Sequence, residues 1–210
     1  MSKRIVHLEH DDDIECPNEV GDGQWTLYSF CSDHASFKHP DDLGVVCNRN
    51  EIVRVRDRKL ATRLRNGLAH VLSYFEHGGC IWMRKDGPIA AGVEFQWDGV
   101  RVAGLLVWEH APGDMGAKTF EDRAKDADCF LRVYTSWANG EGLYYNIEDE
   151  GGNHVDSCGG FYGCDAEHML AEIAPSLVGH EFDVVGDADY LEDDLRRLVD
   201  AGQTAVQPVG

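Results

Sequence analysis

No run of apolar residues in this 210-residue chain approaches the roughly 18 residues that a membrane-spanning helix needs. The first residues, Met1 to Arg4, lack the apolar stretch of a signal peptide and lead directly into a strand pattern. The short motifs of serine hydrolases, phosphate-binding loops, dinucleotide-binding domains and zinc peptidases are also missing. These absences predict a protein that stays in the compartment where it is made and belongs to none of those enzyme classes.

Cysteine is too irregularly placed to build a disulfide framework. The chain has 7 cysteines, an odd number, whereas small secreted domains carry dense, even sets. We therefore expect free thiols in a reducing cytoplasm.

The 43% hydrophobic content is ample for a globular core.

Basic residues are outnumbered by acidic ones. The chain has 19 Lys and Arg against 38 Asp and Glu, which gives a formal net charge of −19 at pH 7. A negative field of this size repels nucleic acids and anionic membranes at long range. The sequence therefore predicts neither direct DNA binding nor membrane association.

Seven of the basic residues are nevertheless crowded into one short region. They are Arg49, Arg54, Arg56, Arg58, Lys59, Arg63 and Arg65. Two interpretations are open. The cluster is either a solvated face that pairs with the protein's own carboxylates, or a local contact site for phosphate or an acidic partner.

The residue patterns predict an α+β fold, with an antiparallel sheet made of a meander and a C-terminal hairpin, packed with two longer helices and short C-terminal helices. Alternation predicts strands over 3–10, 24–31, 45–48, 80–85, 89–96 and 100–109, and the hairpin over 143–158. Three- and four-residue spacing predicts the longer helices over 60–75 and 120–137, and short helices over 168–173 and 191–199.

The domain organisation expected from these elements is simple. A single α+β domain spans 1–175, a short helical extension follows over 176–202, and 203–210 form a flexible tail because they lack any core-forming pattern.

One group of residues has part of the spacing of a metal site. Cys31 and His34 have the C-x-x-H spacing that presents two zinc ligands from a loop, and His39 follows closely. Cys158, Cys164 or His168 would complete a tetrahedral site from far along the chain. Because no second ligand pair has zinc-finger spacing, we expect no cofactor. A zinc-binding module or metal-dependent enzyme is the alternative.

A catalytic triad is suggested only superficially, by His154, Asp156 and Cys158. Alternate side chains of a strand share one face but stand about 6.5–7 Å apart, beyond hydrogen-bond reach. We therefore expect a protein without enzymatic activity.

The most distinctive stretch is WANGEGLYYNIEDEGGNHVDSCGGFYG at 137–163. It predicts a hairpin followed by a glycine-rich segment. Gly159, Gly160 and Gly163 indicate backbone that needs a positive φ or a close approach to another group.

Parts of this stretch and of the upstream sequence match a known pattern. The parts are NGE at 139–141, YY at 144–145, VDSCGGFYG at 155–163, FQWDGVRVAG at 95–104, and the segments 10–19, 25–27 and 41–44. They resemble a family of uncharacterised bacteriophage and mobile-element proteins with an ESPREWDNLG…WDSGQVG…GEVYGY…DSCWGF-like pattern. The resemblance covers most of residues 4–165.

The chain departs from this family at two points. WMRKDG at 82–87 replaces an aspartate-histidine-serine-glycine motif, and Gly160 replaces the tryptophan before the final phenylalanine. The resemblance implies a setting, phage or plasmid cargo in a bacterial host, and no catalytic residues.

Charge and resemblance together predict a small acidic accessory protein that binds a host or defence protein in the bacterial cytoplasm. DNA mimicry is the candidate mechanism of this anti-defence inhibitor, because carboxylates on a rigid scaffold fit a basic nucleic-acid groove. A homo-oligomer is left open. The residues expected to contact the partner are Trp97, Asp98, Asp156, Phe161, Tyr162, Asp187, Asp189, Glu192, Asp193 and Asp194.

Overall fold

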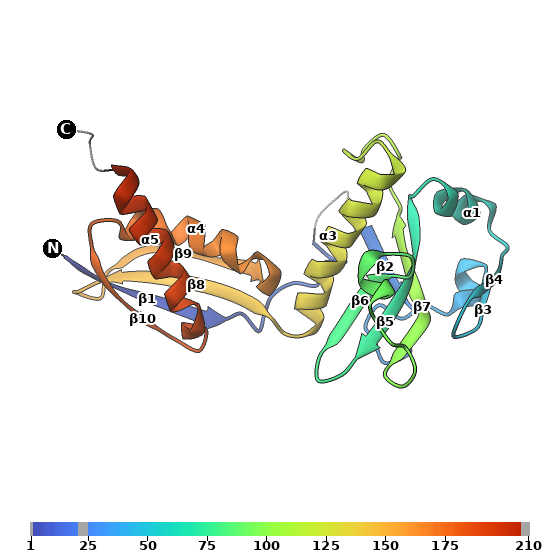
Figure 1. Cartoon of the computed structure of the whole chain (residues 1–210), viewed down its shortest axis with the longest axis horizontal. Helices are drawn as coiled ribbons and strands as arrows, with labels where there is room; N and C mark the ends of the chain where they lie inside the picture. The colour runs from blue at the N-terminus through green and yellow to red at the C-terminus, as the bar shows by residue number, and fades with distance from the viewer. Residues whose placement is uncertain (1, 21–24, 207–210) are drawn as a thin grey trace. The chain divides into compact units, whose positions relative to one another are not determined.

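The structure, a computed structural model, describes residues 2–20 and 25–206. The chain forms two compact units: unit 1 combines Met1–Glu15 with Ser136–Gly210, and unit 2 is Cys16–Thr135. Unit 2 is thus inserted after the first strand of unit 1, and in Figure 1 that blue strand lies among the yellow to red strands of the C-terminal part. This division differs from the expected one, in which a domain ends at residue 175.

Unit 1 is a four-stranded sheet with two helices. Its strands are β1 (Lys3–His10), β8 (Gly142–Asp149), β9 (His154–Tyr162) and β10 (Glu181–Val185), in the order β10-β1-β8-β9. β1 is antiparallel to β8 and parallel to β10. The helices are α4 (Ala166–Leu177) and α5 (Glu192–Val206).

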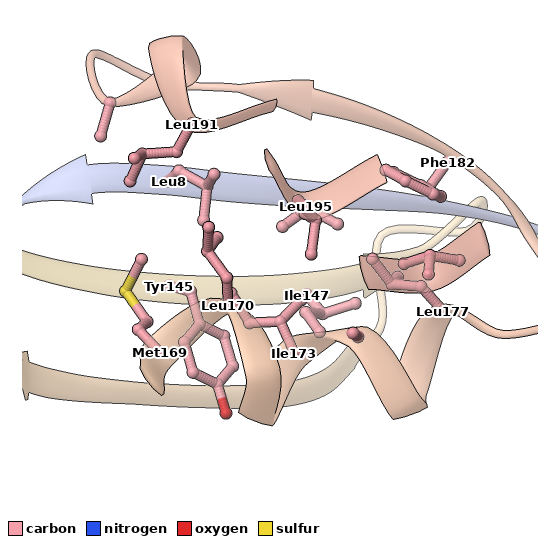
Figure 2. Close-up of a cluster of buried hydrophobic side chains, with 14 of the residues drawn as sticks. Leu8, Tyr145, Ile147, Met169, Leu170, Ile173, Leu177, Phe182, Leu191 and Leu195 are labelled. Atoms are coloured by element: carbon pink, nitrogen blue, oxygen red, sulfur yellow. The ribbon is translucent and has the colours of Figure 1, made fainter. Parts of the chain in front are cut away.

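The core of unit 1 lies between this sheet and the two helices (Figure 2). Val6 and Leu8 of β1 alternate with polar residues and are fully buried, and so is Ile147 of β8. The helices present apolar residues at helical spacing: Met169, Leu170, Ile173 and Leu177 from α4, and Leu195 and Val199 from α5. Because this core covers one face of the sheet, the polar residues of β1 and β8 point to the other.

Unit 2 contains a second four-stranded sheet, which is antiparallel throughout and has the order β2-β7-β5-β6. Its strands are β2 (Trp25–Ser29), β5 (Ala69–Glu76), β6 (Cys80–Arg84) and β7 (Gly99–Trp108). A hairpin of β3 (Val45–Cys47) and β4 (Ile52–Val55) precedes helix α1 (Arg58–Arg65). Helix α2 (Pro88–Ala91) lies between β6 and β7, and α3 (Phe120–Ala138) leads from unit 2 into unit 1.

An ion pair and a hydrogen bond join strand β6 to helix α3 in unit 2. The guanidinium of Arg84, whose side chain is 8% exposed, donates to both carboxylate oxygens of Asp128, at 2.7 and 2.8 Å. The hydroxyl of Thr135 accepts a hydrogen bond from the backbone N–H of Trp82 at 3.1 Å. The two-pronged ion pair fixes both distance and orientation. It therefore sets how the helix lies on this edge of the sheet.

The α+β class is confirmed, and so is the C-terminal hairpin. The predicted single antiparallel sheet is instead two four-stranded sheets, of which that of unit 2 is antiparallel and that of unit 1 is mixed, because β1 and β10 are parallel. The region predicted as an extension, 176–202, instead supplies the edge strand β10 and much of the core helix α5 to unit 1. The tail predicted over 203–210 begins inside α5, and 207–210 lie outside the described residues. Over the residues that are described, no helix combines the length and the apolarity needed to cross a bilayer.

Two predicted elements are wrong. The helix predicted over 60–75 ends at Arg65, Gly67 follows with a φ of 70°, and β5 then begins at Ala69. The strand predicted over 89–96 is replaced at its start by α2, whose first residue, Pro88, suits the first turn of a helix. β7 therefore pairs with β5, and the predicted three-strand meander does not form.

We predict that His70 makes the protein less stable in mild acid. This β5 side chain is 3% exposed between the rings of Trp25 and Phe120, and its Nε2 has no hydrogen-bond partner among the described residues. Burial lowers its pKa to about 4. The unfolded chain, with a histidine pKa of about 6.5, binds the proton first as pH falls. The free energy of unfolding should therefore drop between about pH 6.5 and 4, by up to roughly 3 kcal/mol from this residue.

Urea unfolding of the protein and of His70→Phe, at several pH values across this window, measures the effect. The variant should lose much of the pH dependence, whereas His168→Gln, which changes an exposed histidine of α4, should keep it. Equal pH dependence in the protein and in His70→Phe would contradict the assignment.

Candidate functional site

Unit 1 carries almost all of the net charge. It holds 21 acidic and 4 basic residues, a net −17, whereas unit 2 holds 17 acidic and 15 basic residues, a net −2; together these make the −19 of the chain. Three of the four basic residues, Lys3, Arg196 and Arg197, form ion pairs within unit 1. Most carboxylates of unit 1 are therefore not neutralised by a basic side chain.

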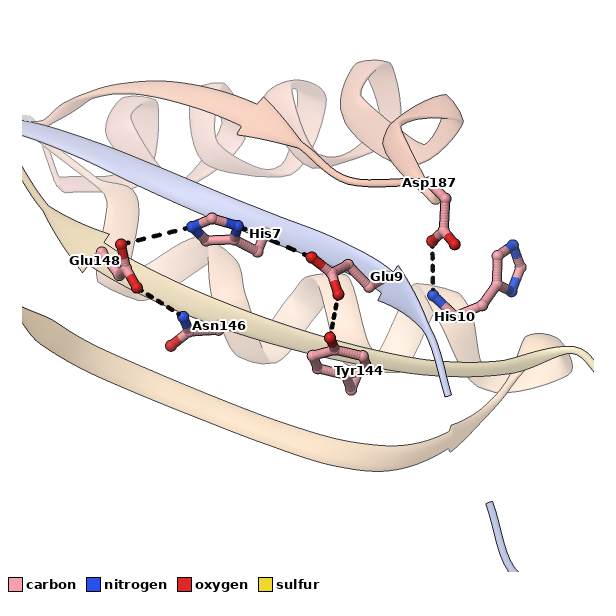
Figure 3. Close-up of polar contacts among 7 residues, drawn as sticks. All are labelled: His7, Glu9, His10, Tyr144, Asn146, Glu148 and Asp187. Atoms are coloured by element: carbon pink, nitrogen blue, oxygen red, sulfur yellow. Dashed lines mark hydrogen bonds and ion pairs between the residues drawn. The ribbon is translucent and has the colours of Figure 1, made fainter. Parts of the chain in front are cut away.

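A row of polar side chains covers the face of the unit 1 sheet that α4 and α5 leave uncovered (Figure 3). Alternation places His7 and Glu9 of β1 on this face, opposite in direction to Val6 and Leu8. Tyr144, Asn146 and Glu148 of β8 lie beside them, because His7 pairs with Asn146 and Glu9 with Tyr144 in the antiparallel register. We call these five residues the polar face.

The polar face is a connected set of half-buried groups. His7 lies between two carboxylates, with Nε2 3.6 Å from Glu148 and Nδ1 4.0 Å from Glu9. The amide of Asn146 donates to Glu148 at 3.2 Å, and the hydroxyl of Tyr144 donates to Glu9. That hydrogen bond raises the pKa of Tyr144, so the hydroxyl remains a donor at neutral pH. The neighbours thus hold both carboxylates in fixed positions.

The described residues assemble neither a metal-binding cluster nor the suggested triad. Across residues 2–20 and 25–206, no three His, Cys, Asp or Glu side chains come together as a set that could hold a metal ion. The suggested triad is not assembled either: His154 contacts the hydroxyl of Ser157 at 3.1 Å, and the carboxylate of Asp156 accepts a hydrogen bond from Tyr145 at 3.3 Å. What the polar face offers is a pattern of fixed negative charge.

The alternative zinc ligands are divided between the two units and have other roles. In unit 2, the ring of His34 packs edge-on against Tyr74 and Trp82, and burial lowers its pKa. His39 accepts a hydrogen bond from the backbone N–H of Asp41 at 3.3 Å. Burial raises the pKa of the Cys31 thiol. Cys158 and Cys164 belong to unit 1. None of the seven cysteines, all of which lie among the described residues, forms a disulfide.

The acidic residues predicted as a contact site lie on the connection from β10 to α5 and in the first turn of α5. Three have internal roles: Asp187 accepts from the backbone N–H of His10 at 2.8 Å, Glu192 pairs with Arg196, and Asp194 pairs with Arg197. Asp189 and Asp193 are exposed and have neither a side-chain hydrogen bond nor an ion pair within the described residues. The carboxylates in the first turn of α5 also suit the positive end of its dipole.

The aromatic residues of the predicted site have mixed roles. Phe161 is half-buried, stacks on Tyr145 with ring centres 6.2 Å apart, and packs on the unit 1 core. Tyr162 donates its hydroxyl hydrogen to the carbonyl of Glu15 at 3.0 Å. In unit 2, Trp97 is 82% exposed, and the neighbouring Asp98 contacts His77 at 3.1 Å. The predicted set is therefore divided between the units, and Trp97 is its most accessible aromatic side chain.

Sequence reasoning missed the polar face. Its signal is present in the strand pattern, because His7-x-Glu9 and Tyr144-x-Asn146-x-Glu148 alternate with apolar residues. What the pattern does not contain is the pairing of β1 with β8, since unit 2 separates the two strands in the sequence.

No family model, no curated protein and no solved structure matches this chain. The resemblance to phage and mobile-element proteins therefore stays a prediction.

The glycine-rich segment beside this site has two distinct constraints. Gly160 has a φ of 82°, and its backbone N–H donates to Asp11 at 3.3 Å. Gly163 is restricted by space, since a Cβ there would lie 2.9 Å from the Cβ of Glu141. The expectation of positive φ or close approach is confirmed at these two positions.

We predict that Gly160→Val lowers the free energy of unfolding by about 1–3 kcal/mol, because a β-branched residue resists a positive φ. Nothing lies within 4 Å of the added Cβ, so the loss would come from the backbone alone. Gly113→Val is the matched control, since its Cβ also meets nothing and its φ is not positive. Chemical denaturation measures the free energy of unfolding of both variants. Equal denaturation midpoints for the two variants would contradict the requirement for a positive φ at Gly160.

Proposed function

We propose that this protein is a non-catalytic binding protein whose unit 1 presents a fixed array of carboxylates to the basic groove of a nucleic-acid-binding protein. It occupies that groove as DNA would. The single observation that carries this is the charge division, 21 acidic against 4 basic residues in unit 1. Acidity that served solubility alone would have no reason to gather in one unit.

The scaffold of unit 1 supports this function physically. Its carboxylates stand on a sheet and on helices with a common buried core, so few of them need to be ordered when a partner binds. Glu9 and Glu148 are further held by Tyr144 and Asn146. Pre-positioned charge of one sign raises both the association rate and the specificity for a basic surface.

The setting we propose follows from the sequence resemblance. The partner is a host or defence protein of a bacterium that carries the phage or mobile element, and the encounter takes place in the bacterial cytoplasm. Inhibition of a defence protein is the expected result, because a groove filled by carboxylates does not accept DNA.

A direct test begins with the purified protein as bait in a lysate of the bacterial host. Each captured protein is then purified, and its affinity is measured at increasing salt and with double-stranded DNA as competitor. Affinity should fall as salt rises, and DNA should displace the protein. If the affinity changes neither with salt nor with added DNA, DNA mimicry is rejected and an apolar contact such as Trp97 is favoured.

We predict that Asp189→Asn combined with Asp193→Asn weakens partner binding without unfolding the protein. Both side chains are exposed, and neither has an internal partner among the described residues. Two lost charge contacts of about 0.5–1 kcal/mol each would raise the Kd roughly 5- to 30-fold at low salt.

The matched control removes the same charge from unit 2. Glu94→Gln with Asp114→Asn changes two exposed carboxylates that also have no side-chain partner in the described part of the chain. It should leave the Kd within about twofold. Equal losses in the two double variants would show that net charge, rather than the surface of unit 1, determines binding.

A further inference from the structure

Unit 2 contains a basic cavity that the acidic binding surface does not use. Its volume is about 440 Å³, which lies within the roughly 300–1,000 Å³ of small-molecule sites. α1 lines one side of it and the segment after β7 the other. The residues that matter are Arg58, Lys59, Arg63, Asn66, His110 and Pro112.

Of the two interpretations of the basic residues of 49–65, pairing with the protein's own carboxylates does not apply to most of them. Within the described residues, Arg56 is the single member of the group with an ion pair, 3.8 Å from Asp41. Arg58, Lys59 and Arg63 therefore bring three positive charges to the cavity, and none of them forms an ion pair with a carboxylate of the described part of the chain. Local positive charge here is available to a ligand.

Helix stability does not account for these cations. α1 has the sequence RKLATRLR, with four basic residues and no acidic one. Arg58 and Lys59 stand in the first turn, where the helix dipole disfavours positive charge, and Lys59 and Arg63 are like charges four residues apart. The carboxylate of Asp57 caps the helix but is already bonded to the N–H of Leu60 at 2.7 Å. An anion in the cavity would relieve the repulsion.

The cavity is also partly organised for a ligand. The guanidinium of Arg63 donates to the carbonyl of Glu109 at 3.2 Å, which ties this α1 side chain to the segment after β7. The ring of His110 packs edge-on against Trp108, 5.5 Å between centres, and Pro112 follows it. The lining thus combines three cationic side chains with an imidazole ring and an apolar proline ring.

We infer that this cavity binds a small phosphate-bearing molecule with a flat ring, a nucleoside monophosphate. Arginine forks match the oxygens of a phosphate, and the side chains of His110 and Pro112 suit the base. A small anion is favoured over DNA because the −19 charge of the chain repels a long polyanion, whereas the field of the cavity acts within about 10 Å at ordinary salt.

Calorimetric titration of the full chain with adenosine monophosphate, adenosine and inorganic phosphate tests this. The monophosphate should bind at least about tenfold more tightly than adenosine, because adenosine lacks the charged group. It should also bind more tightly than inorganic phosphate, which lacks the ring. Affinity equal to that of either fragment, or no binding of the monophosphate, would overturn the assignment.

Variants locate the site. Arg58→Gln with Arg63→Gln should raise the Kd for adenosine monophosphate about tenfold or more, while Arg49→Gln with Arg54→Gln, which removes the same charge outside the cavity, should change it less than about twofold. Lys59→Gln alone, at an exposed position, should weaken binding if the first double variant fails to fold. Equal effects inside and outside the cavity would overturn the site.

Two further measurements distinguish a small-ligand site from a DNA site and from the acidic surface of unit 1. In the first, the affinity for a DNA duplex is compared with that for the monophosphate. If the duplex binds more tightly, and the Arg58 and Arg63 variant loses that binding, the ligand is nucleic acid and the inference is overturned. The Asp189 and Asp193 variant should keep its affinity for the monophosphate within about twofold, so a failure of the acidic surface and a failure of this cavity remain distinguishable.

Discussion

The pairing of β1 with β8 and β10 is the constraint on which the rest of unit 1 depends. β1 is a central strand, with β8 on one side and β10 on the other, and its residues Val6 and Leu8 are fully buried beneath α4 and α5. Both partner strands lie beyond unit 2 in the sequence. The sheet therefore closes only when the chain leaves after β1, completes an inserted unit and returns.

This topology explains why the charge pattern is hard to see along the sequence. The acidic segments at the two ends of the chain become one unit, and the basic residues of 49–65 fall in the inserted unit. The two kinds of electrostatic surface can then have different partners. Carboxylates of unit 1 suit a basic macromolecule, whereas the cavity beside α1 is small and suits a single anionic group.

Local patterns predicted the elements whose signals are unambiguous. The alternation in β1 and β8 and the glycine turn after Asp149 predicted these strands and the hairpin correctly. The apolar stripe of α3 predicted that helix. The apolar pattern over 60–75 fits both the period of a helix and the period of a strand. Gly67, together with Val71 and Phe75, favours a strand after the first two helical turns. The site depends on long-range pairing, which periodicity does not contain.

The central position of β1 has a consequence for synthesis on the ribosome. β1 is made before both of its partners, and at ~5–20 residues per second it waits on the order of ten seconds while unit 2 is made. During that interval Val6 and Leu8 lack the helices that cover them in the folded unit. Charged residues lie beside them, at Lys3, Arg4 and Glu9 and at the aspartates of 11–13. Charge at these positions disfavours pairing of the exposed strand with another chain.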